Sequence, residues 1–173
     1  TEEAVDLLAR ILRTGSRPYF LRSAAAWSLG QVGSEHACAE LVSAFSSVDH
    51  NLRHEALDNL VSVGCDACNV LLEGLKQTDE AVIAGCAEAL RQQPELPEEI
   101  AESLLGDIRS KAPNKWIVWL VGHLPREQFN TAISELQAER PELHYAIALI
   151  WSFMESWIAK HWDLRPSAEF PRG

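Results

Sequence analysis

The sequence lacks most of the features that mark a nucleic-acid-binding or membrane protein. It carries 15 Lys and Arg residues against 25 Asp and Glu, which gives a net charge of −10, and the basic residues form no run. A phosphate backbone or an anionic membrane surface attracts clustered Lys and Arg, so we expect neither partner. No apolar run approaches the roughly 18 residues of a membrane-spanning helix, and no signal peptide is recognisable. We therefore expect a soluble protein of the cytoplasm.

A catalytic set is also missing. The sequence has no Gly-x-Ser-x-Gly turn, no phosphate-binding Gly-rich loop and no paired carboxylates in an apolar setting. Its six His residues are scattered without the spacing of metal ligands. We therefore expect no enzymatic activity, no cofactor and no metal. The chain starts at Thr1 rather than Met, which leaves open whether it is a piece of a longer protein.

The four cysteines are better explained by packing than by chemistry. Cys38 and Cys68 occupy equivalent positions of a repeat, and Cys86 stands where other copies have Ala, so we expect these three to be small buried residues. A reduced, intracellular setting fits this interpretation. Cys65 and Cys68 form a Cys-x-x-Cys pair that could serve redox chemistry or metal binding. A tetrahedral zinc site needs four ligands and no second pair is present, so we expect Cys65 to be an exposed bystander.

What the sequence does contain is an internal repeat. The segment from Leu21 to Gly33 recurs from Leu52 to Gly64, with identical residues at six positions that are 31 apart: Leu21/Leu52, Arg22/Arg53, Ala25/Ala56, Leu29/Leu60, Val32/Val63 and Gly33/Gly64. A fixed period in this range is typical of stacked supersecondary units. The whole fold prediction depends on this feature.

Each copy predicts two helices. The first copy has one helix from about residue 18 to residue 32 and a second one after Gly33-Ser34, where Gly permits a left-handed residue and Ser caps the next helix. The apolar stripe of the first helix is Leu21, Ala25, Leu29 and Val32. A third, weaker copy begins at Asp79 and is interrupted at residues 92–97. Residues 5–12 resemble the second helix of a repeat that lacks its first helix.

This pattern, Leu-Arg-x-x-Ala-x-x-x-Leu with Val-Gly at its end, resembles the HEAT repeat in the short form found in phycobilisome-lyase-type proteins. The resemblance covers residues 4–92 and implies a right-handed α-α superhelix. It also implies a ladder in which an Asp before the first helix of a repeat meets an Arg inside it. Asp49 and Arg53 fit this pattern, whereas Arg22 has no such Asp before its helix, and Ile83 stands in place of the Arg after Asp79.

The last third departs from the repeat. An amphipathic segment from Pro97, a short apolar segment from Lys115 and segments opened by Pro125 and Pro141 predict further helices, and this part holds five of the six Trp residues. We expect an all-α protein with HEAT-like repeats over residues 1–96, an irregular helical C-terminal cap packed on the solenoid over residues 97–162, and a disordered tail over residues 163–173.

Three enzyme classes share the HEAT-like fold, and each requires residues that can be looked for in this sequence. Deoxyhypusine hydroxylases use several His-Glu dipeptides to hold two irons, but here His54-Glu55 is the one such dipeptide in the repeats. Alkylpurine DNA glycosylases need a basic concave face, which the acidic charge opposes. Bilin-lyase-like activity on tetrapyrrole chromophores stays open as the alternative function, because the short repeat is shared with that class.

The favoured function is a non-catalytic interaction module, a scaffold or adaptor. In such stacks the second helices usually line the inner groove, and the aromatic residues of the last helix could add a hydrophobic patch. The acidic balance favours a protein or peptide partner of basic character, with the oligomeric state left open. The predicted partner-binding residues are Glu40, Ser43, Ser47, Asn69, Glu73, Lys76, Trp151 and Trp162.

Overall fold

The structure, a computed structural model, describes the backbone of residues 1–109, 114–124 and 126–161. Within these ranges the regular structure is helical and no strand occurs. The predicted all-α fold is thus confirmed. The chain divides into two compact units, Thr1–Pro97 and Glu98–Gly173. The division lies one residue from the boundary that the sequence suggests at residue 96, and each unit is described by itself below.

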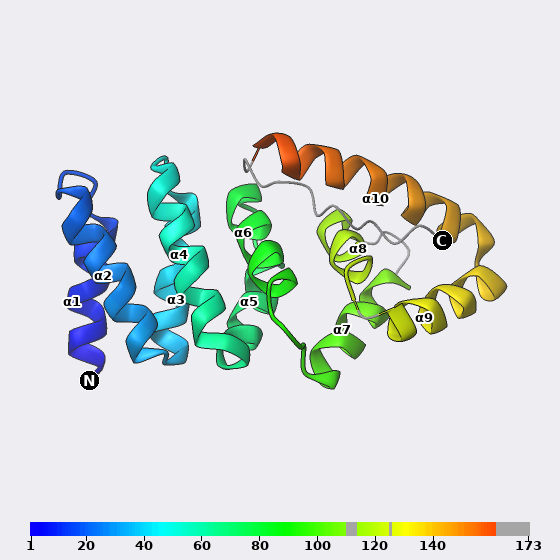
Figure 1. Cartoon of the computed structure of the whole chain (residues 1–173), viewed down its shortest axis with the longest axis horizontal. Coiled ribbons are helices and arrows are strands. Elements are labelled where there is room, and N and C mark those ends of the chain that lie inside the picture. The colour runs from blue at the N-terminus through cyan, green and yellow to red at the C-terminus, as the bar shows by residue number, and fades with distance from the viewer. Residues whose placement is uncertain (110–113, 125, 162–173) are drawn as a thin grey trace. The chain divides into compact units, whose positions relative to one another are not determined.

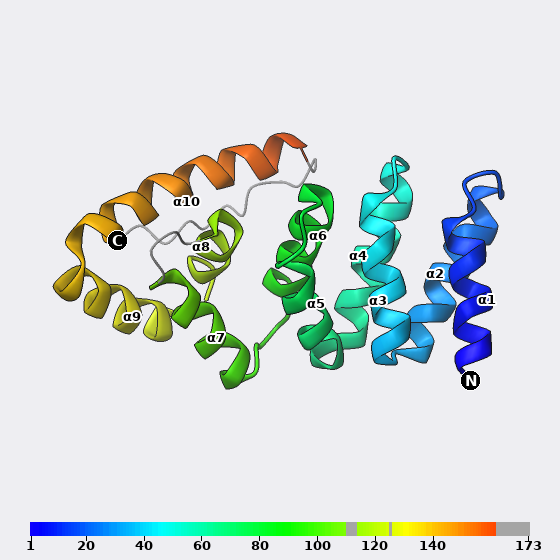
Figure 2. The ribbon, with the colours of Figure 1, turned by 180° about the vertical axis from the view of Figure 1, so that it is seen from behind.

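The first unit consists of α-helices in two layers (Figures 1 and 2). Their bounds are α1 Glu2–Arg13, α2 Tyr19–Val32, α3 Glu35–Ser43, α4 His50–Val63, α5 Cys68–Gly74 and α6 Glu80–Arg91, with short 3₁₀ turns at Ala44–Ser46 and Gly64–Ala67. One layer holds α2, α4 and α6, each packed on the next. The other holds α1, α3 and α5, also packed in sequence. The predicted pairs are therefore stacked side by side.

Local capping signals set the helix boundaries. Gly33 adopts the left-handed conformation at φ 61°, which permits a tight exit from α2. The Ser34 side chain then accepts a hydrogen bond from the Ala37 N–H and caps α3. Asp49 and Asp79 cap α4 and α6 in the same way through their carboxylates. The cap at Ser34 occurs where the sequence pattern predicts it.

The apolar stripes of the repeats form the core, with an exception in α2. Ala25 and Leu29 are buried, as are their equivalents Ala56 and Leu60 in α4. However, Leu21 is 37% exposed and Val32 is 46% exposed, so the prediction that both belong to the core is wrong. Leu52, the equivalent of Leu21, is buried because α2 packs beside α4, whereas the corresponding flank of α2 has no such neighbour among the helices of this unit.

The second unit contains α7 Glu98–Ile108, α8 Lys115–Val121, α9 Arg126–Glu139 and α10 Pro141–His161. Helix α8 packs against α7 and α10, and α10 also packs against α9. Helix α8 is apolar after its first residue, Lys115, and its six residues from Trp116 to Val121 are all buried. The predicted tail, residues 163–173, lies outside the described residues.

Candidate partner-binding surfaces

The polar ladder connects neighbouring repeats through Arg22 and Asp49. Arg22 Nη1 lies 3.5 Å from Asp49 Oδ2, so the Asp that precedes α4 meets the Arg of α2. The Nε of Arg22 also donates to the Leu12 carbonyl of α1 at 3.1 Å. The interpretation that Arg22 lacks an Asp is therefore wrong, because its partner follows it by one repeat. A single Arg side chain of α2 here contacts both α1 and the N-terminal cap of α4.

A similar polar contact joins the end of the first repeat to the start of the third. Ser46 Oγ donates to Asp79 Oδ2 at 2.7 Å. This hydrogen bond and the N–H of Ala81 hold the pKa of Asp79 below its usual value. A lowered carboxylate pKa means that the contact contributes to stability above the unfolded-state pKa and loses that contribution as the pH falls through the folded-state pKa.

The predicted groove residues of the first repeat are engaged within the chain. The Glu40 side chain is 12% exposed and forms an ion pair with Arg13 of α1. His36 Nε2 lies 3.6 Å from Glu40 and 3.5 Å from Asp6, which extends the network between α1 and α3. A carboxylate so placed is a poor contact for an incoming cation, because its charge is already compensated.

The two serines predicted beside Glu40 make local hydrogen bonds. Ser43 is exposed and its hydroxyl donates to the Glu40 carbonyl at 2.6 Å. Ser47 accepts a hydrogen bond from the Asp49 N–H at 3.1 Å and one from Arg22 at 3.5 Å. Ser47 therefore supports the ladder, and Ser43 is the more accessible of the two.

In the second repeat, the predicted residues lie on the exposed side of α5 and just after it. Asn69, Glu73 and Lys76 are exposed, and Lys76 Nζ lies 2.6 Å from Glu73 Oε1. This ion pair is three residues apart on an exposed surface, where such a pair contributes little to stability. It leaves this part of the groove close to neutral, so the first unit offers little of the acidic groove that the sequence suggests.

The Trp residues of the second unit differ in how far they are buried. Trp116 and Trp119 are buried in α8 and meet edge to face, with ring centroids 6.4 Å apart. Trp151 is half-buried on α10, and its indole lies against Gly122 and, at 6.5 Å between centroids, against His123. Trp162, the other predicted aromatic contact, lies outside the described residues.

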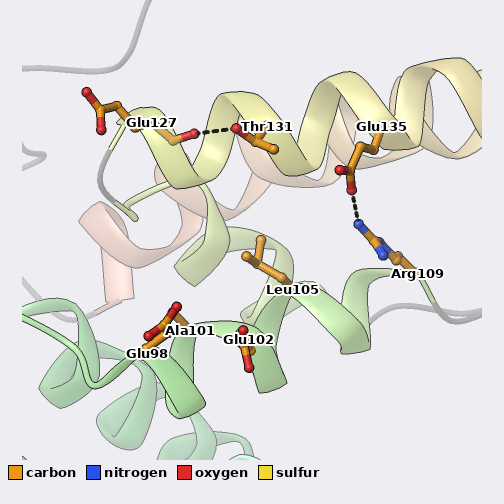
Figure 3. Close-up of a pocket in the computed structure, with 8 residues that line it drawn as sticks. All are labelled: Glu98, Ala101, Glu102, Leu105, Arg109, Glu127, Thr131 and Glu135. Carbon is orange, nitrogen blue, oxygen red and sulfur yellow. Dashed lines mark hydrogen bonds and ion pairs between the residues drawn. The ribbon is translucent and has the colours of Figure 1, made fainter.

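An acidic groove that the sequence did not reveal lies between α7 and α9 in the second unit (Figure 3). It has a volume of about 380 Å³ and is lined by Glu98, Ala101, Glu102, Leu105, Arg109, Glu127, Thr131 and Glu135. Arg109 forms an ion pair with Glu135 across the groove. Three glutamates are thus left as its excess charge, around the apolar surface of Leu105 and Ala101.

Sequence reasoning missed this groove for a physical reason. Glu98 and Glu102 are four residues apart on α7, and Glu127 and Glu135 are eight apart on α9, so each pair lies along one side of its own helix. That spacing was visible in the sequence and reads as an ordinary solvated face. The placement of α9 opposite α7 is a tertiary feature that no local pattern reports.

The cysteines are packed as predicted. Cys38, Cys68 and Cys86 are buried free thiols, and Cys65 is exposed. Burial raises the pKa of Cys38 to about 11 and the pKa of Cys86 to about 12. Burial, with Cys65 nearby, raises the pKa of Cys68 to about 12. A raised pKa leaves little thiolate near neutral pH, which opposes a nucleophilic or redox role for these three.

The described residues offer neither a metal-binding cluster nor a membrane-spanning helix. Among them, no group of three or more His, Cys, Asp and Glu residues is arranged to hold a metal ion. Of the helices that the structure describes, none has both the length and the apolar character needed to cross a membrane.

Comparisons with known proteins gave two structural likenesses and one family match. The chain is similar to the crystal structures of two engineered proteins from the Northeast Structural Genomics Consortium. The first is 17% identical with a TM-score of 0.39, over 85% of this chain and 77% of the other. The second is 20% identical with a TM-score of 0.36, over 88% of this chain and 48% of the other. No curated protein matches the sequence. Residues 21–47 match the model of the PBS lyase HEAT-like repeat, a segment that holds most of α2 and all of α3.

Proposed function

We propose that this protein is a non-catalytic scaffold that binds a protein or peptide partner of basic character, and that the groove between α7 and α9 receives the basic segment. The observation that carries the proposal is the charge of this groove. Four glutamates and one arginine line it, a net of three negative charges around an apolar floor. A Lys or Arg side chain combines an aliphatic stem with a charged head, so it matches both parts of the groove.

The pairing of the glutamates favours the groove between α7 and α9 over the surface of the first unit as the site for a basic partner. In the first unit, the Glu40 carboxylate is occupied by Arg13 and His36, and Glu73 is paired with Lys76. In the groove of the second unit, Arg109 compensates Glu135, and no ion pair joins Glu98, Glu102 or Glu127 to another described residue. Complementary charge raises association rate and specificity, so the surface with uncompensated carboxylates is the better candidate.

The test compares two variants of equal charge. One variant carries Glu98→Gln, Glu102→Gln and Glu127→Gln in the groove, and the matched control carries Glu2→Gln, Glu3→Gln and Glu80→Gln in the first unit. Binding of a fluorescent peptide with repeated Lys-Leu-Ala-Lys units is followed by anisotropy at physiological salt. We expect the groove variant to bind about tenfold more weakly and the control to bind within about twofold of the parent.

Two outcomes would contradict the proposal. Equal weakening of both variants would mean that the peptide senses the net charge of −10 and not the groove. No weakening in either variant would remove basic character as the basis of recognition. Affinity capture from source cells with the same three proteins then identifies the natural partner, which the groove variant should fail to retain.

A lyase-type enzyme or enzyme subunit is the second candidate. The observation that favours it is the match of residues 21–47 to the PBS lyase HEAT-like repeat. A bilin chromophore added to the purified chain should show a shifted visible absorbance band if this candidate is right. An unchanged spectrum would leave the scaffold function as the one supported.

A further inference from the structure

The groove between α7 and α9 carries its excess charge at one end. Glu98, Glu102 and Glu127 line the half in which both helices begin, and none of these three is paired with another residue that the structure describes. At the other end Arg109 pairs with Glu135, so these two charges cancel. Figure 3 shows Arg109 and Glu135 side by side, and Glu127 lies eight residues from Glu135, or about 12 Å along α9. A ligand with separated charges therefore meets a different surface at each end.

Arg109 retains hydrogen-bond donors that no described residue uses. Its Nη2 contacts one oxygen of the Glu135 carboxylate, Oε2. A guanidinium has several N–H donors, and within the described part of the chain no second acceptor is bonded to this side chain. The side chain is 46% exposed, so a ligand can reach the remaining donors. A carboxylate matches the fork of an arginine especially well, so it is the ligand group expected at this end.

A second arginine holds the backbone at this end of the groove. Arg140 Nη1 donates to the Arg109 carbonyl at 3.2 Å, and Arg140 Nε lies 3.3 Å from Glu142 Oε1. The first contact joins the residue before α10 to the residue after α7, and the second compensates the charge of Arg140. This end is therefore fixed by hydrogen bonding and close to neutral, so a carboxylate of a ligand meets no excess of negative charge there.

The size of the groove favours an extended ligand over a helical one. Glu98 and Arg109 are eleven residues apart, which is about 16 Å along α7. A helix of that length is about 10 Å wide and takes up roughly 1,300 Å³, whereas the groove holds about 380 Å³. An extended peptide spans the same distance with about five residues and places alternate side chains on one face. The segment that fits is therefore short and extended.

The middle of the groove suits the central part of such a segment. Ala101 is buried and Leu105 is half-buried, so they offer an apolar surface between the two charged ends. Thr131 is exposed, and its hydroxyl donates to the Glu127 carbonyl at 3.0 Å. Because its proton is already used, the Thr131 oxygen is available to a ligand as an acceptor, which matches the N–H groups of an extended backbone.

From these observations we infer that the groove selects an extended partner segment with a Lys or Arg side chain and a carboxylate at opposite ends of about five residues. The basic side chain lies among Glu98, Glu102 and Glu127, and the carboxylate bonds to Arg109. An apolar side chain between them covers Leu105. Arg109 is thus a specificity-determining residue. This inference rests on the proposed function, because it specifies the segment that the same groove receives.

Four unlabelled peptides test the charges and their spacing. The dipolar peptide is Lys-Ala-Leu-Ala-Glu with blocked ends, in which Lys, Leu and Glu share one face of the extended chain. The basic peptide has Gln in place of Glu, and the adjacent peptide, Ala-Lys-Glu-Leu-Ala, has no separation of charge. The fourth is the basic peptide with a free C-terminal carboxylate. Each competes against the fluorescent Lys-Leu-Ala-Lys peptide of the proposed function, and anisotropy is the readout.

The expected order of the competitors depends on Arg109. With the parent chain, the dipolar peptide should compete about threefold more strongly than the basic peptide, and the adjacent peptide more weakly than both. Arg109→Gln should reverse the order of the dipolar and basic peptides, because the four glutamates of the groove then face no arginine. It should also tighten binding of the fluorescent peptide by about twofold. Arg109→Lys keeps the charge and should keep the order of the parent.

Arg13→Gln is the matched control. The Arg13 side chain is exposed like that of Arg109 and is also paired with a glutamate, Glu40 of the first unit. Its substitution changes the net charge of the chain by the same amount, so it should leave the order of the competitors as in the parent. Circular dichroism melts establish that each variant is folded.

Two results would overturn this inference alone. The dipolar peptide competes no better than the basic or the adjacent peptide with the parent chain, or folded Arg109→Gln keeps the order of the parent. If the triple glutamine variant of the groove binds the fluorescent peptide as the parent does, the proposed function fails and this inference fails with it. Competition by the free acid that exceeds that of the dipolar peptide supports the inference and assigns the carboxylate to a chain end, whereas the reverse order assigns it to an acidic side chain.

Discussion

The two units of this protein use different means to pack helices closely. In the first unit, small residues stand where helices meet, and polar contacts repeat from one pair to the next. Gly74 lies against Cys86, Gly85 against the ring of Phe45, and Arg22 and Ser46 each reach the Asp that caps a following helix. In the second unit, the Trp151 indole of α10 lies against Gly122, and the large side chains of Trp116 and Trp119 are buried in α8. The first unit thus depends on many modest contacts between repeats, whereas the second unit depends on a few contacts of large side chains.

The largest expected effect on stability concerns the contact between Phe45 and Gly85. Phe45 is fully buried, so Phe45→Ala should lower the free energy of unfolding by about 3–5 kcal/mol. Gly85→Ala should cost about 1–3 kcal/mol in the parent, because its methyl group would overlap the Phe45 ring. The same substitution should cost less in the Phe45→Ala background, where the ring is gone. Urea denaturation of the four proteins measures this coupling, and additive costs would show that the two residues do not constrain each other.

A smaller effect compares two glycines of the second unit. Gly122→Ala places a methyl group against the Trp151 indole and should lower stability by about 1–3 kcal/mol. Gly106→Ala is the matched control, because Gly106 lies within α7 with nothing near its Cβ position, and it should raise stability by about 0.5–1 kcal/mol. Thermal unfolding followed by near-UV circular dichroism reports on the Trp environment. Equal effects of the two substitutions would contradict the view that the second unit packs around Gly122.

The prediction with the smallest expected effect concerns the two roles of Asp49, which pairs with Arg22 and caps α4. Asp49→Asn keeps a good N-cap residue for α4 but removes the charge that faces Arg22, so it should cost about 1 kcal/mol. Asp49→Ala removes both functions and should cost about 1 kcal/mol more. Chemical denaturation at low and at high salt distinguishes the ion pair from the helix cap, because salt screens the interaction between the charges. If Asp49→Asn is neutral, the ladder contributes to alignment of the repeats rather than to stability.

Much of the fold could be predicted because its signals are local. The repeat of Leu21–Gly33 at Leu52–Gly64, the caps Ser34, Asp49 and Asp79, and the left-handed Gly33 all follow from short sequence patterns. The buried positions of Cys38, Cys68 and Cys86 follow from equivalence between copies. The errors lie where a residue depends on its neighbours in space. Leu21 and Val32 match the apolar stripe and yet are exposed, and Arg22 finds its Asp in the next repeat.

The candidate surfaces were harder to predict from the sequence than the fold. Glu40 looked like a groove carboxylate, and the structure places it in an ion pair with Arg13, which is 27 residues earlier in the chain. The groove between α7 and α9 has no sequence signature, because its two walls come from separate helices.

The sequence alone determined that this chain is helical, that its first half is made of stacked pairs, and where most of those helices begin and end. These properties depend on periodicity and capping, which act over a few residues. The tertiary structure decided which carboxylates stay available, which apolar residues remain in water and where a groove opens. Those properties depend on the distance between side chains that are far apart in sequence, and packing of whole helices sets that distance.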